Sequence, residues 1–388
     1  MDIQTILSEK LSEIQSHYKH LHAHPELSFE ETNTSAYIKS QLEKLDLEVH
    51  QLPQNAVLAF LKAPNAEKTI GLRAELDALP LVESTNAPYP SQNRGKMHAC
   101  GHDLHMTCAL GTTMVLSEFK DQLTNNILFI FQHGEEKIPG GAQDVINSAF
   151  FKSHKPDLMI ALHSFPDLKA GEVGFREGPY MASADEIDIH IKGPGGHAAM
   201  PHKTVDTVVT AAHVLVALQQ IRSRFIPAET PGVLSFGNVV TNSVMNIIPK
   251  EVKLEGTFRI MDETWRKKVH YRVKEIANHT AQSMGAECEV VIRHGYPSIA
   301  NDESITKNIR NIAENTLGKE NVFDLPLRMT ADDFGYYAHE IPSTYFRLGV
   351  ADESGKCAGL HTPEFLPDLK AIETGVKVLS EVLLASKE

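Results

Sequence analysis

The segment KTIGLRAELDALP, residues 68–80, holds the pattern that decides the fold class. Its first half is an almost continuous apolar run, which is typical of a strand in a parallel sheet covered by helices on both faces. The same character recurs in NNILFIF (125–131), PDLMIAL (156–162) and STYFRLGV (343–350). Because helical stretches alternate with these runs, we expect an α/β fold with a mainly parallel sheet flanked by helices.

Four helices are expected around these strands. The N-terminal stretch has apolar side chains on one helical face, namely Ile3, Ile6, Leu7, Leu11 and Ile14. A second helix begins near Asp103, a third covers GGAQDVINSAFF (140–151), and a closing helix covers residues 367–386.

The middle of the chain follows a different pattern. EIDIHIKG (186–193) alternates isoleucines with polar residues, as a strand of a sheet with one wet face does. The elements expected after it are a helix near 203–224, strands at 232–240 and 251–260, a helix near 263–284 and a strand at 287–295. The resulting order β-α-β-β-α-β is the split βαβ arrangement. We therefore expect residues 1–180 and 292–388 to form one domain, and residues 181–291 an inserted α+β domain.

Composition excludes several classes of protein. The 388 residues carry 37 Lys and Arg against 50 Asp and Glu, a net charge of −13, which argues against a nucleic-acid or anionic-membrane partner. No apolar stretch approaches the roughly 18 residues of a membrane span, and the N-terminus lacks the pattern of a secretory signal. The four cysteines are scattered and too few for a disulfide framework. We therefore expect a cytoplasmic protein.

Carboxylates and imidazoles follow nearly every expected strand of the large domain. The residues are Glu75 and Asp77, then His133, Glu135 and Glu136, then His163, and finally His361. In open α/β sheets ligands bind outside the carboxyl ends of the strands, so this recurrence predicts a site there.

The stretch HACGHDLH, residues 98–105, is chemically the densest in the chain. On extended chain Cys100 and His102 point to the same side, and Gly101 allows a close approach. Asp103 then caps the next helix or orients a ligand. Cys100 could be half of a disulfide, a nucleophile with a histidine base, or a metal ligand. Metal ligation fits best, since thiolate, imidazole and carboxylate together suit Zn²⁺, and imidazole with carboxylate also admits Mn²⁺ or Co²⁺.

The adjacent acids Glu135 and Glu136 can supply two roles from one loop. Neighbouring side chains diverge, so one carboxylate can bind metal while the other takes a proton from water and passes it to a leaving amine. The alternative for such a pair is a solvated acidic turn.

Several motifs in order over nearly the whole chain resemble those of the aminoacylase/carboxypeptidase metallohydrolases. They are LHAHPELSFEE, RAELDALP, MHACGHDLH, FIFQHGEE, ALHSFPDLKAGEV, GPGGHAAMPH, NIIP, EGTFR and GLHTPEFLPD. The most similar branch holds amidohydrolases such as hippurate hydrolases, indole-3-acetyl-amino-acid hydrolases and N-acetyl-diaminopimelate deacetylases.

The resemblance implies a catalytic domain with two divalent metal ions and a lid domain through which a homodimer forms. The ions implied are Zn²⁺ or Mn²⁺, with Co²⁺ or Ni²⁺ as alternatives. The metal ligands implied are Cys100, His102, Glu136, His163 and His361. Glu135 is implied as the general base and acid, and Asp77 as a support of the site. In the lid, His197 would polarise the scissile carbonyl, from the partner subunit in some relatives, while Asn246 and Arg259 would hold the substrate carboxylate.

Two positions depart from the family pattern. Glu75 stands where the family usually has aspartate, and FQHGEE replaces the usual FQPAEE, which places His133 before the acidic pair. The second departure bears on substrate specificity more than on catalysis. We expect cleavage of N-acyl amino acids, with a dipeptidase or carboxypeptidase as the alternative and a non-catalytic metal- or ligand-binding protein as a second one.

Overall fold

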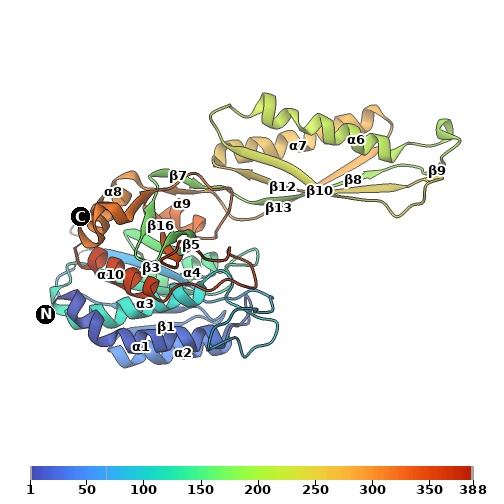
Figure 1. The fold of residues 1–388 in the computed structure, drawn as a ribbon. Helices are drawn as coiled ribbons and strands as arrows, with labels where there is room; N and C mark the ends of the chain where they lie inside the picture. The colour runs from blue at the N-terminus through green and yellow to red at the C-terminus, as the bar shows by residue number, and fades with distance from the viewer. Residues whose placement is uncertain (1, 67, 386–388) are drawn as a thin grey trace. The chain divides into compact units, whose positions relative to one another are not determined.

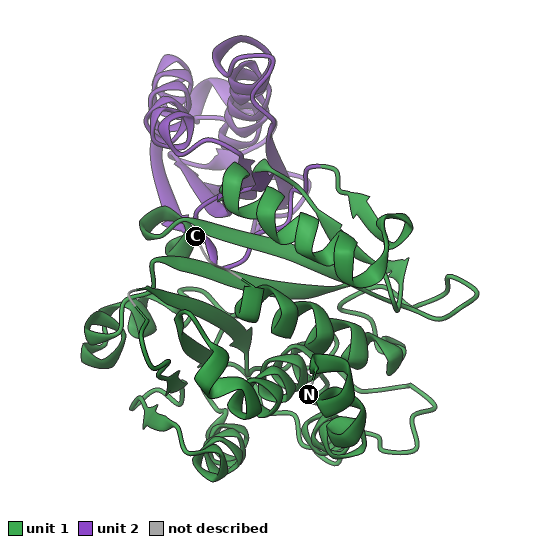
Figure 2. Ribbon diagram, turned by 90° about the vertical axis from the view of Figure 1, so that its left-hand side faces the viewer, with its two compact units in different colours: residues 1–178, 300–326, 336–388 green, residues 179–299, 327–335 purple. Residues whose placement is uncertain are grey.

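The computed structural model describes residues 2–66 and 68–385, which divide into two compact units (Figures 1 and 2). Unit 1 comprises residues 1–178, 300–326 and 336–388, and unit 2 comprises residues 179–299 and 327–335. The unit boundaries therefore lie at 178/179 and 299/300, whereas the sequence pattern placed them near 181 and 292. Segment 327–335 falls in unit 2 because Arg328 exchanges backbone hydrogen bonds with Tyr180 and Ala182.

Unit 1 is built on an eight-stranded sheet with the order β1-β2-β4-β3-β5-β16-β6-β15. The four central strands β4, β3, β5 and β16 run parallel to one another. Strands β3 and β16 are buried along their whole length. The bounds are β1 Glu48–Gln51, β2 Val57–Leu61, β3 Thr69–Glu75, β4 Asn126–Gln132, β5 Leu158–Lys169, β6 Val173–Phe175, β15 Val322–Asp324 and β16 Ser343–Ala351. The α/β prediction with a mainly parallel sheet is confirmed.

Helices cover this sheet. Helices α1, α3 and α10 pack against one another (Figure 1), through side chains such as Ile14, Leu110 and Val376 that are inaccessible to solvent. The bounds are α1 Ile3–Ala23, α2 Thr32–Leu42, α3 His102–Leu116, α4 Ala142–Asn147, α5 Ala149–Ser153, α8 Glu303–Leu317, α9 Gly335–Glu340 and α10 Lys370–Ala385. Ser386, the last residue of the expected closing helix, lies outside the described residues.

Two expected helices differ in the structure. The single helix expected over 140–151 is wrong, because Ser148 adopts an extended conformation and its hydroxyl caps α5 by accepting from the Phe151 N–H. The helix expected near 203–224 begins only at α6, Thr207–Leu218, because the Asp206 carboxylate caps it there. A π-helical turn, Ile221–Phe225, follows it.

Unit 2 contains a four-stranded antiparallel sheet with the order β10-β12-β8-β13. Its strands are β8 Asp185–Lys192, β10 Gly232–Val240, β12 Glu251–Ile260 and β13 Glu287–His294, and its long helices are α6 and α7, Glu263–Ser283. Ile187, Ile189 and Ile191 face a core shared with both helices. The predicted β-α-β-β-α-β order is therefore confirmed. Two short additions, β9 Gly196–His197 and β11 Ile247–Ile248, pair with each other.

A buried ion pair ties α7 to the sheet of unit 2. Asp185 accepts hydrogen bonds from Arg266 at 2.6 and 2.8 Å and from His270 Nε2 at 2.6 Å. Burial raises the pKa of Asp185, but the bonds from Arg266 and His270 outweigh it and lower the pKa to about 2.

Within the described residues, no helix is both long and apolar enough to cross a membrane.

We predict that Asp185→Ala destabilises unit 2 by about 1–3 kcal/mol, because it leaves buried donors of Arg266 and His270 without their acceptor, while Glu263 stays paired with Arg266. The only tryptophan, Trp265, lies beside Arg266 at the start of α7, so tryptophan fluorescence during urea unfolding reports on this unit. The pKa of Asp185 in the folded protein lies below its ordinary value. Its contribution to the stability of unit 2 is therefore present above about pH 4 and is lost as the pH falls through about 2.

The matched control is Glu186→Gln, which removes a half-exposed carboxylate paired with Arg293. A surface pair of this kind contributes at most about 1 kcal/mol. Equal effects of the two substitutions would contradict the role given to Asp185.

Candidate active site

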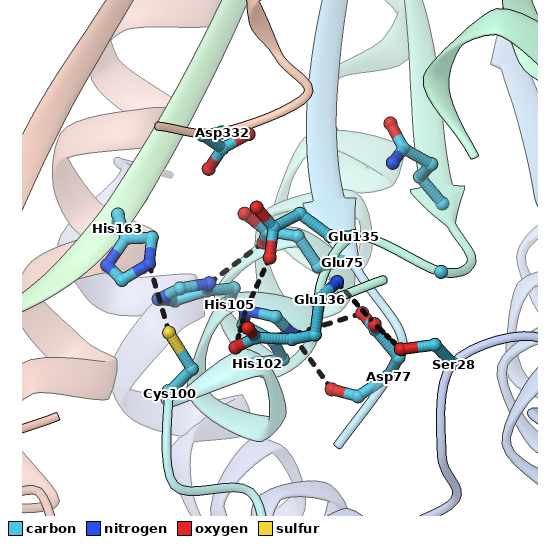
Figure 3. A network of polar contacts seen from close by, with 12 residues as sticks. Ser28, Glu75, Asp77, Cys100, His102, His105, Glu135, Glu136, His163 and Asp332 are labelled. Atoms are coloured by element: carbon cyan, nitrogen blue, oxygen red, sulfur yellow. Dashed lines mark hydrogen bonds and ion pairs between the residues drawn. The ribbon is translucent and has the colours of Figure 1, made fainter. Parts of the chain in front are cut away.

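The carboxyl ends of the central strands place the predicted polar residues at one edge of the sheet (Figure 3). Glu75 ends β3 and is level with Gln132, the last residue of β4. On the other side of β3, Arg73 is level with Ala161 of β5, which places His163 two residues further toward the same edge. Because these strands are parallel, residues far apart in the sequence converge there.

Cys100 and His102 reach this edge from the turn that leads into α3. Extended chain was predicted here, but the structure has a tight turn, in which the Gly101 N–H donates to the His98 carbonyl at 3.3 Å. Gly101 has φ +84°, and a Cβ there would lie 2.6 Å from Ser164 Oγ. Gly101, not Asp103, is the residue that precedes the first turn of the helix.

All five predicted metal ligands come together in unit 1. Cys100 Sγ lies 3.4 Å from His163 Nε2 and 3.3 Å from His361 Nε2. Glu136 Oε1 lies 3.2 Å from His361 Nε2 and 3.9 Å from His102 Nε2. Zinc holds nitrogen at about 2.0 Å and sulfur at about 2.3 Å in a tetrahedron, so its ligand atoms lie roughly 3.3–3.6 Å apart. The three spacings of 3.2–3.4 Å are close to this range and fit shared cation sites, and the 3.9 Å between Glu136 and His102 is slightly wider.

Polar atoms buried without a hydrogen-bond partner point to the same conclusion. His102 Nε2 and Glu136 Oε1 are both inaccessible to water and have no such partner. An unsatisfied buried polar atom is costly and calls for an explanation. Imidazole nitrogen and carboxylate oxygen are donors that divalent ions prefer, so a bound cation would satisfy both.

The electrostatics disfavour Cys100 as a nucleophile. Burial, followed by the charges of Glu136 and Glu135, raises the pKa of the Cys100 thiol well above its ordinary value. A nucleophilic cysteine requires the opposite shift. All four cysteines lie in the described residues and are free, which also removes the disulfide alternative.

His102 is oriented by Asp77. Its Nδ1–H donates to the Asp77 carbonyl at 2.8 Å, which directs Nε2 toward Cys100 and Glu136. Burial lowers the pKa of His102, but the Asp77 bond and the Glu75 and Asp77 charges outweigh it and raise the pKa to about 10. Asp77 Oδ2 accepts the Glu136 N–H at 2.8 Å and the Ser28 hydroxyl at 2.7 Å (Figure 3).

A second buried layer involves Glu75, one of the acids predicted at the strand ends and a departure from the family motif. Glu75 pairs with Arg73 and accepts from His105 Nδ1 at 2.8 Å. The Ser164 N–H donates to His105 Nε2 at 2.8 Å, so that nitrogen carries no proton and His105 is neutral. Ser164 Oγ in turn donates to the Cys100 carbonyl. This chain of contacts fixes the backbone that presents Cys100 and His163.

Two further buried histidines hold together the elements that surround the site. His22 of α1 is buried between Asp103, at 2.7 Å, and Glu83, at 3.2 Å, and thereby ties α1 to the start of α3. His133 is also buried, and its Nε2 lies 3.2 Å from the Asp144 carboxylate of α4. Its ring therefore packs inside unit 1 beside the loop that carries Glu135 and Glu136.

His197, Asn246 and Arg259 belong to unit 2. His197 is paired with Ile247 between β9 and β11, and the Ala198 N–H donates to the Asn246 carbonyl, so His197 and Asn246 are neighbours. Arg259 lies on β12, where its Nε donates to Thr257 Oγ1 at 3.2 Å. In the described part of the chain no carboxylate pairs with Arg259.

Comparison with known proteins identifies the family. The sequence model of peptidase family M20/M25/M40 matches residues 71–385. The chain belongs to this family. The curated relatives of this M20 protein include the N-acetyldiaminopimelate deacetylase of Lactobacillus acidophilus, which is 36% identical over 98% of this chain and 99% of that protein. The enzyme of the same name from Priestia megaterium is 35% identical over 94% and 95%.

Solved structures agree. A dinuclear metal-binding peptidase of the M20 family from Bacillus subtilis is 29% identical, with a TM-score of 0.82 over 96% of this chain and 97% of that one. The predicted resemblance is therefore confirmed, and this M20 protein is a metal-dependent hydrolase that acts on amide bonds.

We predict that Asp77→Asn weakens metal binding by this M20 protein about 10–100-fold, as substitutions of groups that orient metal-binding histidines do. Asp77 Oδ1 lies 3.3 Å from His102 Nδ1 while Oδ2 accepts from Glu136 and Ser28, so an amide, which has one acceptor oxygen, cannot serve both sides. Competition with a chromophoric chelator measures the affinity. The matched control is Asp157→Asn, whose carboxylate accepts the Thr69 N–H at the opposite end of β3. Unchanged affinity in Asp77→Asn would refute the orienting role.

Proposed function

We propose that this chain hydrolyses the amide bond of N-acyl amino acids, releasing a carboxylic acid and a free amino acid. The observation that carries the proposal is the convergence of one thiol, three imidazoles and two carboxylates from four separate parts of unit 1. Two of their buried atoms lack a hydrogen-bond partner.

Cys100, His102, Glu136, His163 and His361 would hold two divalent ions. Two of the groups overlap at Cys100. One contains Cys100, His102 and His163, and the other contains Cys100, Glu136 and His361. Zn²⁺ and Mn²⁺ suit this donor set, with Co²⁺ and Ni²⁺ as alternatives. The M20 peptidase from Bacillus subtilis is described as dinuclear, which supports two ions here.

Glu135 is the proposed general base and acid. The residue is 6% exposed, and Oε2 lies 3.9 Å from His102 Nε2, beside the ligand cluster. Divalent ions at this site would supply Lewis acidity that lowers the pKa of water and polarises the amide carbonyl. Glu135 takes the proton of the attacking water and delivers it to the departing nitrogen.

Residues of unit 2 would hold the substrate. Arg259 has a guanidinium with no carboxylate partner in the described chain, and such a group binds a carboxylate through two parallel hydrogen bonds. Asn246 and His197 are exposed neighbours on the β9–β11 pair. We assign Asn246 to the substrate carboxylate with Arg259, and His197 to the scissile carbonyl.

The curated relatives named above remove an acetyl group from an amino acid, which favours a small acyl group. We also infer a homodimer through unit 2. Strand β10 lies at the edge of its sheet and exposes Val239 and Val240, and Met245 in the following loop is fully exposed. Exposed apolar edges of this kind are typical of interfaces. The four free cysteines support a cytoplasmic location.

The function is tested by removing metal and restoring Zn²⁺, Mn²⁺, Co²⁺ or Ni²⁺ one at a time. Each form is assayed on N-acetyl amino acids, N-benzoyl amino acids and dipeptides. We expect the apoprotein to be inactive and at least one metal to restore cleavage of an N-acyl amino acid. Cleavage of dipeptides alone would favour the peptidase alternative, and tight metal binding without any cleavage would favour a non-catalytic protein.

We predict that Glu135→Gln retains the bound metal and lowers kcat about 10²–10⁴-fold, because an amide cannot accept the proton. Metal content is measured by mass spectrometry and kcat by amino-acid release. The comparison variant is Glu136→Gln, one residue further on, which is expected to lose metal as well as activity. A Glu135→Gln variant with more than about a tenth of the original kcat would rule out the base assignment.

A further inference from the structure

One short segment between α1 and α2, residues 28–31, contacts both Asp77 and the loop that carries Glu135 and Glu136. Ser28 donates to Asp77, Phe29 packs on Gly134, and Glu31 accepts from the Gly134 N–H. The first of these contacts is visible in Figure 3. The segment lies about a hundred residues before that loop in the sequence.

Glu31 makes the most direct contact. Its carboxylate is inaccessible to solvent, and Oε1 lies 2.7 Å from the Gly134 nitrogen. A backbone N–H that donates to a carboxylate forms a shorter and stronger bond than a neutral pair does. Burial, followed by the charge of Asp77, raises the pKa of Glu31 to about 7. Because a buried carboxylate is unfavourable without compensation, packing alone does not account for an acid at this position.

Phe29 restrains the same loop residue from another side. Its φ is +68°, which is rare for a bulky side chain and indicates a conformation imposed by its surroundings. The ring covers Gly134 so closely that a Cβ on that glycine would lie 2.8 Å from it, and the ring contacts His133 edge to face at 5.5 Å. Gly134 also has a positive φ, +68°. Gly134 therefore combines a left-handed backbone conformation with close contact from the Phe29 ring.

The two backbone amides that flank Glu135 are both held by carboxylates. Glu31 holds the N–H of Gly134, and Asp77 holds the N–H of Glu136. Ser28 steadies Asp77 from the same segment that supplies Glu31. The peptide unit after Glu135 is therefore fixed directly, and the chain before it is fixed one residue away at Gly134, which restricts the backbone of Glu135.

We propose that Glu31 is a positioning residue for Glu135, acting through its hydrogen bond to the Gly134 amide. The proposal rests on the function proposed above, in which Glu135 is the base. A displacement of a catalytic group by about 1 Å can lower a rate about 100-fold. Loss of the Gly134 contact is therefore expected to lower kcat while substrate binding and metal content stay nearly unchanged.

The experiment compares Glu31→Ala, Glu31→Gln and Glu30→Ala with the metal-loaded parent chain. Glu30 is the matched control, because its carboxylate is next in sequence but exposed and paired with Lys96. In Glu31→Ala we expect kcat to fall about 10–100-fold, with KM changed less than about threefold and metal content unchanged. Glu31→Gln keeps an acceptor oxygen and is expected to recover kcat to within about threefold of the parent. Glu30→Ala is expected to match the parent.

A second readout does not depend on activity. Hydrogen–deuterium exchange of peptides covering residues 133–137 reports on the Gly134 amide. Exchange there should become faster in Glu31→Ala and stay at the parent rate in Glu30→Ala. If the parent chain cleaves no substrate of the panel, the proposed function is wrong. The exchange measurement still tests the contact, because unchanged exchange in Glu31→Ala would show that Glu31 does not protect the Gly134 amide.

Several results would overturn the proposal: parental kcat in Glu31→Ala, a change in KM alone, loss of metal, or no recovery in Glu31→Gln. If Glu31→Ala does not fold, Phe29→Ala takes its place. The Phe29 side chain is 37% exposed, so its removal leaves no closed cavity. We expect Phe29→Ala to lower kcat at unchanged metal content and to speed exchange at residues 133–137, and a parental result in both measurements would contradict the positioning role.

Discussion

The site depends on Asp77, whose carbonyl and carboxylate hold three separate parts of unit 1 together. The carbonyl accepts from His102 at the start of α3, and the carboxylate accepts from the Glu136 amide after β4 and from Ser28 before α2. These contacts set the direction of two proposed ligands at once. A single acid just past the end of β3 therefore positions proposed metal ligands that come from two different parts of the chain.

Charge balance organises the rest of the cluster. Glu75, Asp77, Glu135 and Glu136 bring four carboxylates close together. The buried permanent cations near them in the described chain include Arg73, which pairs with Glu75, and Arg347, which is level with His163 on β16. Neutral His105, held between Ser164 and Glu75, adds no charge. The negative charge of these carboxylates is balanced only with additional positive charge, which divalent ions would provide.

Most of the fold could be predicted from the sequence, because apolar runs and alternating patterns report directly on burial. The central strands and the β-α-β-β-α-β order of unit 2 followed from such patterns. Helix ends were less predictable, since single caps decide them. Ser148 splits one expected helix and Asp206 delays another. The site was predictable where side chains follow strands, as for His163, Glu136 and His361. The unit 2 residues His197, Asn246 and Arg259 were proposed only from the family motifs.

The two kinds of sheet, the family and the candidate metal ligands follow from the sequence alone, because periodicity and residue chemistry are local properties. Only the tertiary structure decided how those residues are oriented. The turn at Gly101, the neutral state of His105 and the bond between Glu31 and Gly134 each depend on partners that the chain brings together from distant positions. A backbone amide carries no side-chain signal, so no sequence pattern could reveal that Glu31 would bind one a hundred residues away.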